Sequence, residues 1–186
     1  MKLSKGDRMP PEGSEELRGA FDFGPARTLQ QDVEFGVLQI VDIALKAISP
    51  AVNDPTTAIG SVDQLSRILI RFASREAPES ILYDPPGVFR VHVPWIGFER
   101  LLDSAFEQIR LYSKSDVAVS LRLLRALADI AITTPDPLFR RILAERGRRI
   151  VEGCASALGE EDLNPLRERA DALENLSAPP HAGNGT

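Results

Sequence analysis

Apolar side chains recur three and four residues apart along most of this 186-residue chain, and this spacing constrains the fold more than any other feature. It places the apolar side chains on one face of a helix, which must then be buried against other helices. We therefore predict a mainly all-α fold, a bundle of five to six helices. The predicted helices span residues 28–49, 55–72, 98–112, 115–132 and 137–157, with a sixth from Asn164-Pro165 onward.

One segment departs from the helical pattern and predicts a short β-hairpin or strand-like arm near residues 80–94. Phe89 and Val91 alternate with Arg90 and His92, which is the two-residue period of a half-buried strand. The sequence Asp-Pro-Pro-Gly just before these residues supplies a turn. A proline shortly after them closes the strand, because it has no N–H to donate to a neighbour.

The composition of the two ends separates them from the helical region. Residues 1–23 are rich in Gly, Pro, Glu and Ser and poor in large apolar side chains, which is typical of a flexible lead-in. Residues 177–186 share this composition and predict a disordered tail. We therefore expect a single helical domain over residues 24–176.

The charge balance and the apolar runs exclude several classes of function. The chain has 22 basic and 27 acidic side chains, a formal net charge of -5, which argues against nucleic-acid binding. Cys154 is the only cysteine, so there is no internal disulfide and no multi-cysteine zinc site. No run approaches the roughly 20 apolar residues that span a bilayer, and the N-terminus lacks the apolar core of a secretory signal. We expect a soluble chain with a cytoplasmic location.

The densest polar segment is SPAVNDPTTA, residues 49–58, between the first two predicted helices. Its structural interpretation is a helix stop and a helix start. Asp54 can cap the second helix, and Pro55 loses no needed N–H at the first helical position. Asn53 suits a tight turn, because asparagine tolerates left-handed backbone angles. The sequence repeats this Asp-Pro or Asn-Pro device before two later helices, which favours the structural interpretation.

The first predicted helix gives the same segment a functional alternative. Its polar side chains fall on one narrow stripe, whereas nearly all other positions are apolar, which predicts a helix surrounded by protein over most of its circumference. In solvent, Asp42 and Lys46 on this stripe form an ordinary i,i+4 pair. In an internal groove, Asp42 needs Lys46 or a ligand to offset the cost of burying its charge. The candidate ligand-binding residues are then Arg27, Gln31, Gln39, Asp42, Asn53, Asp54 and Thr57.

Residues 27–58 read RTLQQDVEFGVLQIVDIALKAISPAVNDPTTA. This segment resembles the hallmark segment of a family of bacterial predicted membrane proteins, domain of unknown function 2254. The resemblance implies a connection to the membrane, because members of the family typically carry transmembrane helices ahead of this segment. It implies no particular reaction. Lys46 stands where the family pattern has Arg, which replaces a planar, bidentate donor by a point charge.

Two further patterns carry functional alternatives. FRRILAERGRRI, residues 139–150, places five arginines beside apolar side chains, which fits a solvated helix face or contact with anionic lipid headgroups. A carboxylate site for a hard cation could be formed by Asp42, Asn53, Asp54 and Asp63. Against it, we expect Asp63 to pair with Arg67 and face water. The sequence has no phosphate loop, HExxH or GxSxG motif. We predict no cofactor and no metal.

Two functional hypotheses follow from these patterns. The first is a non-enzymatic helical module, a cytoplasmic regulatory or assembly domain at the inner face of the cell membrane. Its partners would be a membrane protein, the membrane surface or further copies of the chain in a homo-oligomer. The second is a small-ligand or ion-binding domain, with hydrolysis as one option, built from the candidate residues above. The wide apolar arc of the first helix favours the first hypothesis, and the polar stripe favours the second.

Overall fold

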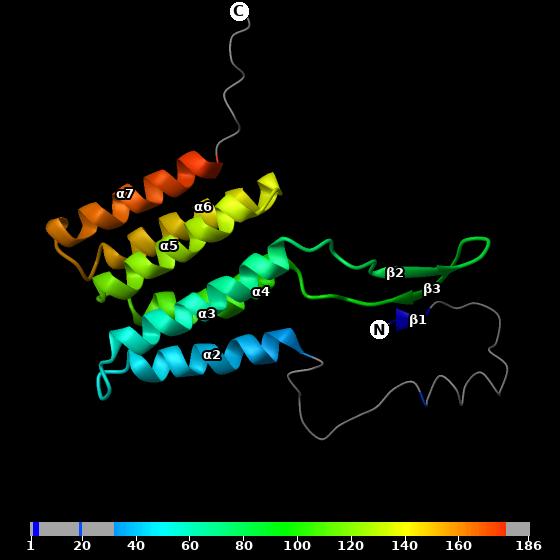
Figure 1. Ribbon diagram of the computed structural model, residues 1–186, viewed down its shortest axis with the longest axis horizontal. Helices are drawn as coiled ribbons and strands as arrows, with labels where there is room; N and C mark the ends of the chain where they lie inside the picture. Colours follow the sequence, from blue (N-terminus) through cyan, green and yellow to red (C-terminus); the bar gives the residue numbers. More distant parts are fainter. Residues whose placement is uncertain (1, 4–18, 20–31, 178–186) are drawn as a thin grey trace, which may run out of the picture. The chain divides into compact units, whose positions relative to one another are not determined.

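The computed structural model describes residues 2–3, 19 and 32–177 (Figure 1). They divide into two compact units, a helical unit with residues 34–76 and 97–177 and a sheet unit that includes residues 77–96. The prediction of a mainly all-α chain with one short β excursion is confirmed. Most of the expected lead-in and the tail beyond Ser177 lie outside the described residues.

The helical unit is a bundle organised around one central helix, α5. This helix packs against α3, α4, α6 and α7, and its buried leucines occupy the middle of the core. Figure 1 shows α2 at the margin of the same bundle, and its Glu34 bonds to Arg100 and Ser104 of α4. The helices are α2 (Val33–Ala47), α3 (Pro55–Ala73), α4 (Phe98–Tyr112), α5 (Val117–Thr133), α6 (Pro137–Cys154) and α7 (Glu160–Ser177).

Aspartates cap three of these helices. The carboxylate of Asp54 accepts a hydrogen bond from the N–H of Thr57 at 3.1 Å at the start of α3. Asp116 and Asp136 accept main-chain N–H groups in the same way at the starts of α5 and α6. Each bond satisfies one of the N–H groups that a helix start leaves without a partner. The predicted Asp-Pro starts of α3 and α6 are confirmed.

Two helix starts differ from the prediction. α7 begins at Glu160, so the predicted start at Asn164-Pro165 is wrong, and Pro165 lies inside the helix. Leu163 is only 2% exposed, and its burial together with three acidic residues in the first turn offsets the N–H that the proline lacks. The first predicted helix is described from Val33 onward, with Asp32 outside the helix, and its expected cap at residues 28–31 lies outside the described residues.

The sheet unit contains the predicted hairpin. β2 (Ile81–Asp84) and β3 (Val88–His92) pair antiparallel, and β1 (Lys2–Leu3) pairs antiparallel with the other side of β3. The strand order is therefore β1-β3-β2. Gly87 closes the turn with φ +124°, a left-handed angle that only glycine adopts without strain.

Candidate functional site

The SPAVNDPTTA segment joins α2 to α3, and its main-chain N–H groups bond to carbonyls of the segment and of the end of α2. The N–H of Asn53 donates to the carbonyl of Ser49 at 2.9 Å, and the N–H of Asp54 donates to that of Ala47 at 2.8 Å. Asn53 adopts φ +48°, the left-handed angle expected for it. These contacts are those of a helix stop followed directly by a helix start.

The carboxylate of Asp54 is occupied by its capping role. One oxygen accepts the N–H of Thr57, and the other accepts the hydroxyl of the same threonine at 2.5 Å. The hydroxyl bond is the main cause that lowers the pKa of Asp54, and the bond from the Thr57 N–H adds to it. Both oxygens therefore have an internal donor, as a helix cap requires.

The polar stripe of α2 faces solvent. Gln39 and Asp42 are exposed, and so is Lys46 on the same stripe. The buried side of α2 is a seam of small and β-branched residues, Val37, Val41, Ala44 and Ala47. Ile43 is 51% exposed beside the polar stripe, so the covered arc of α2 is narrower than its apolar composition predicts. The rest of the bundle covers one side of the helix, because α2 lies at its margin.

The structure gathers only part of the predicted site. Asn53 and Asp54 lie in the turn next to Thr57 at the start of α3, whereas Gln39 and Asp42 lie along α2. Arg27 and Gln31 lie outside the described residues. Within the described parts of the chain, no group of three or more His, Cys, Asp or Glu side chains is placed to hold a metal ion.

Asp63 has a different partner from the one predicted. Its carboxylate pairs with the guanidinium of Arg122 on α5 and not with Arg67. The reason is the packing of α3 against α5, which brings Arg122 to this face of α3. Asp63 therefore links two helices of the bundle and takes no part in the turn.

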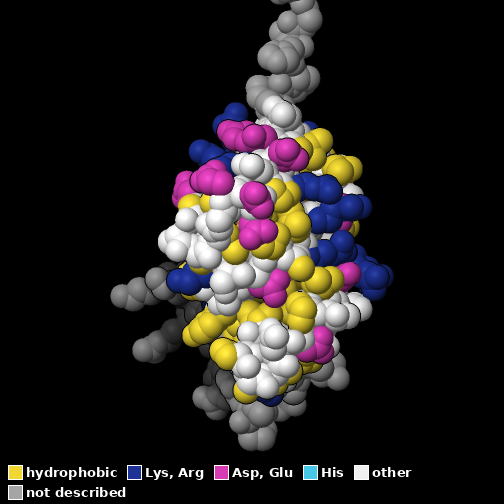
Figure 2. All heavy atoms as spheres, turned by 90° about the vertical axis from the view of Figure 1, so that its left-hand side faces the viewer, with side chains coloured by type: hydrophobic (Ala, Val, Ile, Leu, Met, Phe, Trp, Pro, Cys, Tyr) yellow, Lys and Arg dark blue, Asp and Glu magenta, His cyan; other side chains and the backbone are white. Residues whose placement is uncertain are grey.

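A groove of about 470 Å³ lies beside the end of α2. Figure 2 views this end of the bundle and shows hydrophobic side chains gathered in its lower part, on the side of α2. The groove has no carboxylate, amine, guanidinium or imidazole in its lining, which suits apolar side chains better than an ion. Its lining residues are Leu45, Ile48, Ser49, Pro50, Gln108, Tyr112 and Ser115.

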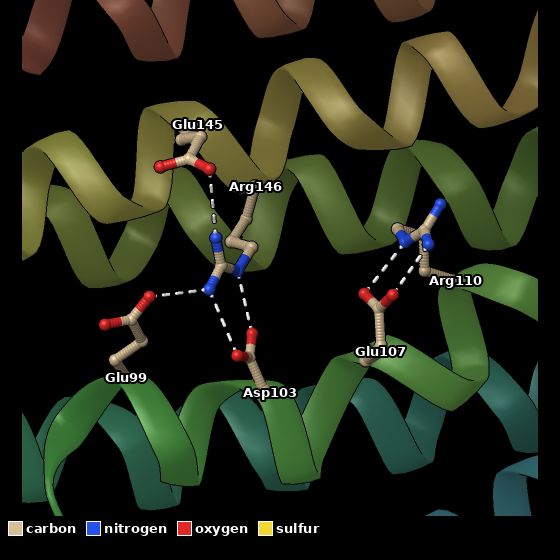
Figure 3. A network of polar contacts seen from close by, with 6 residues as sticks. All are labelled: Glu99, Asp103, Glu107, Arg110, Glu145 and Arg146. Atoms are coloured by element: carbon tan, nitrogen blue, oxygen red, sulfur yellow. Dashed lines mark hydrogen bonds and ion pairs between the residues drawn. The ribbon is translucent and has the colours of Figure 1, made fainter.

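A polar network around the buried Arg146 lies elsewhere, between α4 and α6 (Figure 3). Arg146, whose side chain is 11% exposed, donates to Asp103 through Nε at 2.7 Å and through Nη2 at 3.0 Å. Nη2 also reaches Glu99 at 2.8 Å. Asp103 is the main cause that raises the pKa of Arg146. Next to this network Glu107 and Arg110 pair on α4 at 2.7 Å, which lowers the pKa of Glu107. The arrangement joins two helices and leaves no free acid or base.

The sequence contains a signal for this network that the predictions above did not use. Glu99, Asp103 and Glu107 repeat every four residues and so share one face of α4. Arg146 lies between Leu143 and Ile150 on the buried face of α6. Its position on the apolar stripe distinguishes it from the other arginines of α6. Of the five arginines that we grouped together, Arg141, Arg148 and Arg149 are exposed.

The fold and the candidate site together define a helical module that carries a small β-hairpin. A family model described as "Predicted membrane protein (DUF2254)" matches residues 2–129, and the chain belongs to this family. The resemblance of residues 27–58 is thereby confirmed. The matched residues end near the C-terminal end of α5, before α6 and α7.

Two mycobacterial proteins are similar in sequence to this chain. An uncharacterized protein of Mycobacterium tuberculosis and one of Mycobacterium bovis are each 42% identical to this chain over 138 residues. The matched segment is 74% of this chain and 26% of each relative, so the chain spans about a quarter of their length. No solved structure matches the chain. None of the helices in the described residues is long and apolar enough to cross a membrane.

Proposed function

We propose that this chain is a non-catalytic assembly or regulatory module that docks on the membrane-embedded part of a DUF2254 protein, at the inner face of the membrane. One observation carries the proposal, the mismatch between the composition of α2 and its burial. Ten of the 15 residues of α2 are apolar, yet only four of these are buried. Val33 is 42% and Ile43 is 51% exposed on this helix.

The exposed apolar side chains of α2 form a usable docking face. Ile43 is exposed and Ile40 is half-buried, and the two lie on one flank of the helix, beside the buried seam. At the end of α2 the groove adds apolar surface, including Tyr112, which is 71% exposed. An apolar helix face bordered by polar residues such as Asp42 is a common recognition surface for another helix.

One ion pair links the start of α2 to α4, and its Arg100 side chain is 72% exposed. Glu34 at the start of α2 accepts two hydrogen bonds from the guanidinium of Arg100 on α4, both at 3.1 Å. Its carboxylate also accepts the hydroxyl of Ser104 at 2.9 Å. The Glu34 side chain is only 17% exposed, so these bonds are partly shielded from water. A fixed helix loses less entropy on binding than a mobile one.

The comparisons support a partner within the same family. The family is described as predicted membrane proteins, and about three quarters of each mycobacterial relative lies outside the matched segment. That larger part is a natural binding partner for a separate copy of the module. A membrane-embedded protein offers helices whose exposed ends can receive an apolar flank such as that of Ile43.

Cell fractionation tests this proposal. The chain is expressed in a mycobacterium that carries such a relative and in a strain that lacks its gene, and the share of the chain in the membrane pellet is measured. We expect sedimentation with the membrane only where the relative is present. Ile43→Gln should reduce that share several-fold, because it places an amide in an apolar contact.

The matched control is Ile132→Gln. Ile132 is 64% exposed on α5, so the same chemical change occurs on a surface outside the proposed face. This variant should sediment like the parent chain. The proposal is wrong if the parent chain stays in the supernatant of the strain that carries the relative, or if Ile43→Gln sediments as well as the parent.

A further inference from the structure

Strand β2 presents an open edge. It is an outer strand in the order β1-β3-β2, and none of the described residues forms a strand beyond it. All of its residues, Ile81 to Asp84, are exposed. An outer strand carries N–H and C=O groups that point away from the sheet, and these can pair with a strand from another chain.

The hydrogen bonds of the hairpin identify the outward groups. The carbonyl of Ser80 accepts the N–H of Val93 at 2.8 Å, so the main-chain groups of residue 80 face β3. Successive residues in an antiparallel strand direct their main-chain groups to opposite sides. Leu82 therefore faces β3 as well, and Ile81 directs its N–H and C=O groups to the open edge. The pairing of β2 with β3 shifts register between Leu82 and Tyr83. The extra residue lies on β3, so the alternation continues along β2 and Tyr83 also faces the open edge.

The side chains of β2 lack the usual protection of an outer strand. Such strands commonly carry lysines or inward-pointing charges that discourage pairing with another chain. Asp84 is the only charged residue of β2, and it is paired with Arg90 of its own hairpin at 3.1 Å. The other side chains are apolar, with Ile81 37%, Leu82 45% and Tyr83 60% exposed.

We propose that β2 pairs with β2 of a second copy of this chain, antiparallel and with the two-fold axis at Leu82. In this register Ile81 of each copy lies opposite Tyr83 of the other, and the two residues exchange N–H···O=C hydrogen bonds in both directions. The two Leu82 residues form the pair without hydrogen bonds, whose Cα atoms lie about 4.5 Å apart. The inference is independent of the proposed membrane docking.

The charge pattern supports a second copy as the occupant. A two-fold pairing uses the same strand on both sides, so a charged residue must not lie opposite the same residue of the second copy. In the proposed register Asp84 lies opposite Ser80, and the apolar residues lie opposite one another. Like charges directly opposite would destabilise the pair, and this register has none within Ser80 to Asp84. Pro85 directly after β2 ends the pairing there.

Sedimentation velocity of the full chain at rising concentration tests this dimer. Ile81→Pro removes an N–H that faces outward, so the hairpin keeps its own hydrogen bonds while the partner loses a donor. Ile81→Thr is the matched control, because it keeps both the N–H and a β-branched side chain. We expect the parent and Ile81→Thr to dimerise. The dimer of Ile81→Pro should have a dissociation constant at least about tenfold higher, since each copy loses an intermolecular hydrogen bond.

Cross-linking tests the register independently of the proline variant. Leu82→Cys should form a disulfide-linked dimer under mild oxidation, because the two positions meet at the axis. Val88→Cys, at a position 43% exposed on β3, should not, and Cys154 is buried. The inference is overturned if the parent chain is monomeric at every concentration, if Ile81→Pro dimerises like the parent, or if Leu82→Cys cross-links no better than Val88→Cys.

Discussion

The junction between α2 and α3 and the interface between α4 and α6 use polar residues in opposite ways. At the junction the polar residues are adjacent in sequence, exposed, and bonded mainly to their own neighbours, as with Asp54 and Thr57. At the interface Arg146 and Asp103 are 43 residues apart in sequence, and the buried guanidinium of Arg146 meets a half-exposed carboxylate of Asp103. Polar density along a chain therefore marks helix ends, whereas the buried polar contacts of this fold depend on how helices pack.

Among the substitutions considered, one that breaks the interface between α4 and α6 should lower the free energy of unfolding the most. Arg146→Ala should lower the free energy of unfolding by about 2–3 kcal/mol, because it removes charge-assisted hydrogen bonds and leaves Asp103 without its partner. Urea denaturation measures the change. Arg148→Ala, at an exposed arginine of the same helix, should stay within about 0.5 kcal/mol. Equal effects of the two substitutions would contradict the distinction between buried and exposed arginines.

Substitutions at the junction between α2 and α3 should lower the stability less, and their effect should depend on whether the new residue accepts a left-handed backbone angle. Asn53→Ala should cost about 1 kcal/mol, because alanine resists the left-handed angle φ +48°. Asn53→Gly should be close to neutral, since glycine adopts this angle without strain. Thermal melts of both variants give the comparison. If both substitutions destabilise equally, the Asn53 side chain makes a contact that the turn geometry does not explain.

Each of the two regions contains a carboxylate that makes stability depend on pH. The pKa values of Asp54 and Glu107 are lowered in the folded chain, mainly by the Thr57 hydroxyl and by Arg110 respectively. Their contribution is fully present above the ordinary carboxyl pKa and is lost as pH falls through the lowered values. We expect the melting temperature to fall between about pH 5 and pH 3. Glu107→Gln should make this fall shallower, and an unchanged slope would contradict the assignment.

The weakest effect is expected on the polar stripe of α2. Asp42→Asn should change stability by less than about 0.5 kcal/mol, because Asp42 is exposed. The same variant tests the ligand-binding hypothesis in thermal melts with metals, nucleotides and common metabolites. If the function lies in docking, none of these compounds raises the melting temperature of the parent chain. A rise that Asp42→Asn abolishes would restore the polar stripe as a binding site.

The elements predicted well from the sequence are those whose signals are local. Pro55 after Asp54 marks the start of α3, and the two-residue period around Val91 marks β3. The errors arose where distant packing decides. Leu163 belongs to α7 because its side chain is buried, although Pro165 follows it. Asp63 pairs with Arg122 of α5, which is distant in sequence. Periodicity shows that Ile43 lies on an apolar arc, but only the packed bundle shows that no described helix covers it.

Hydrogen exchange along α2 decides whether this helix is the docking face. The amides of α2 (Val33–Ala47) are compared in the purified chain and in the chain bound to membranes that contain the mycobacterial relative. We predict slower exchange in α2 on binding, strongest around Ile43, and no comparable change at the exposed end of α5 near Ile132. Binding to these membranes without any change in α2 would contradict the proposal that this helix contacts the membrane protein.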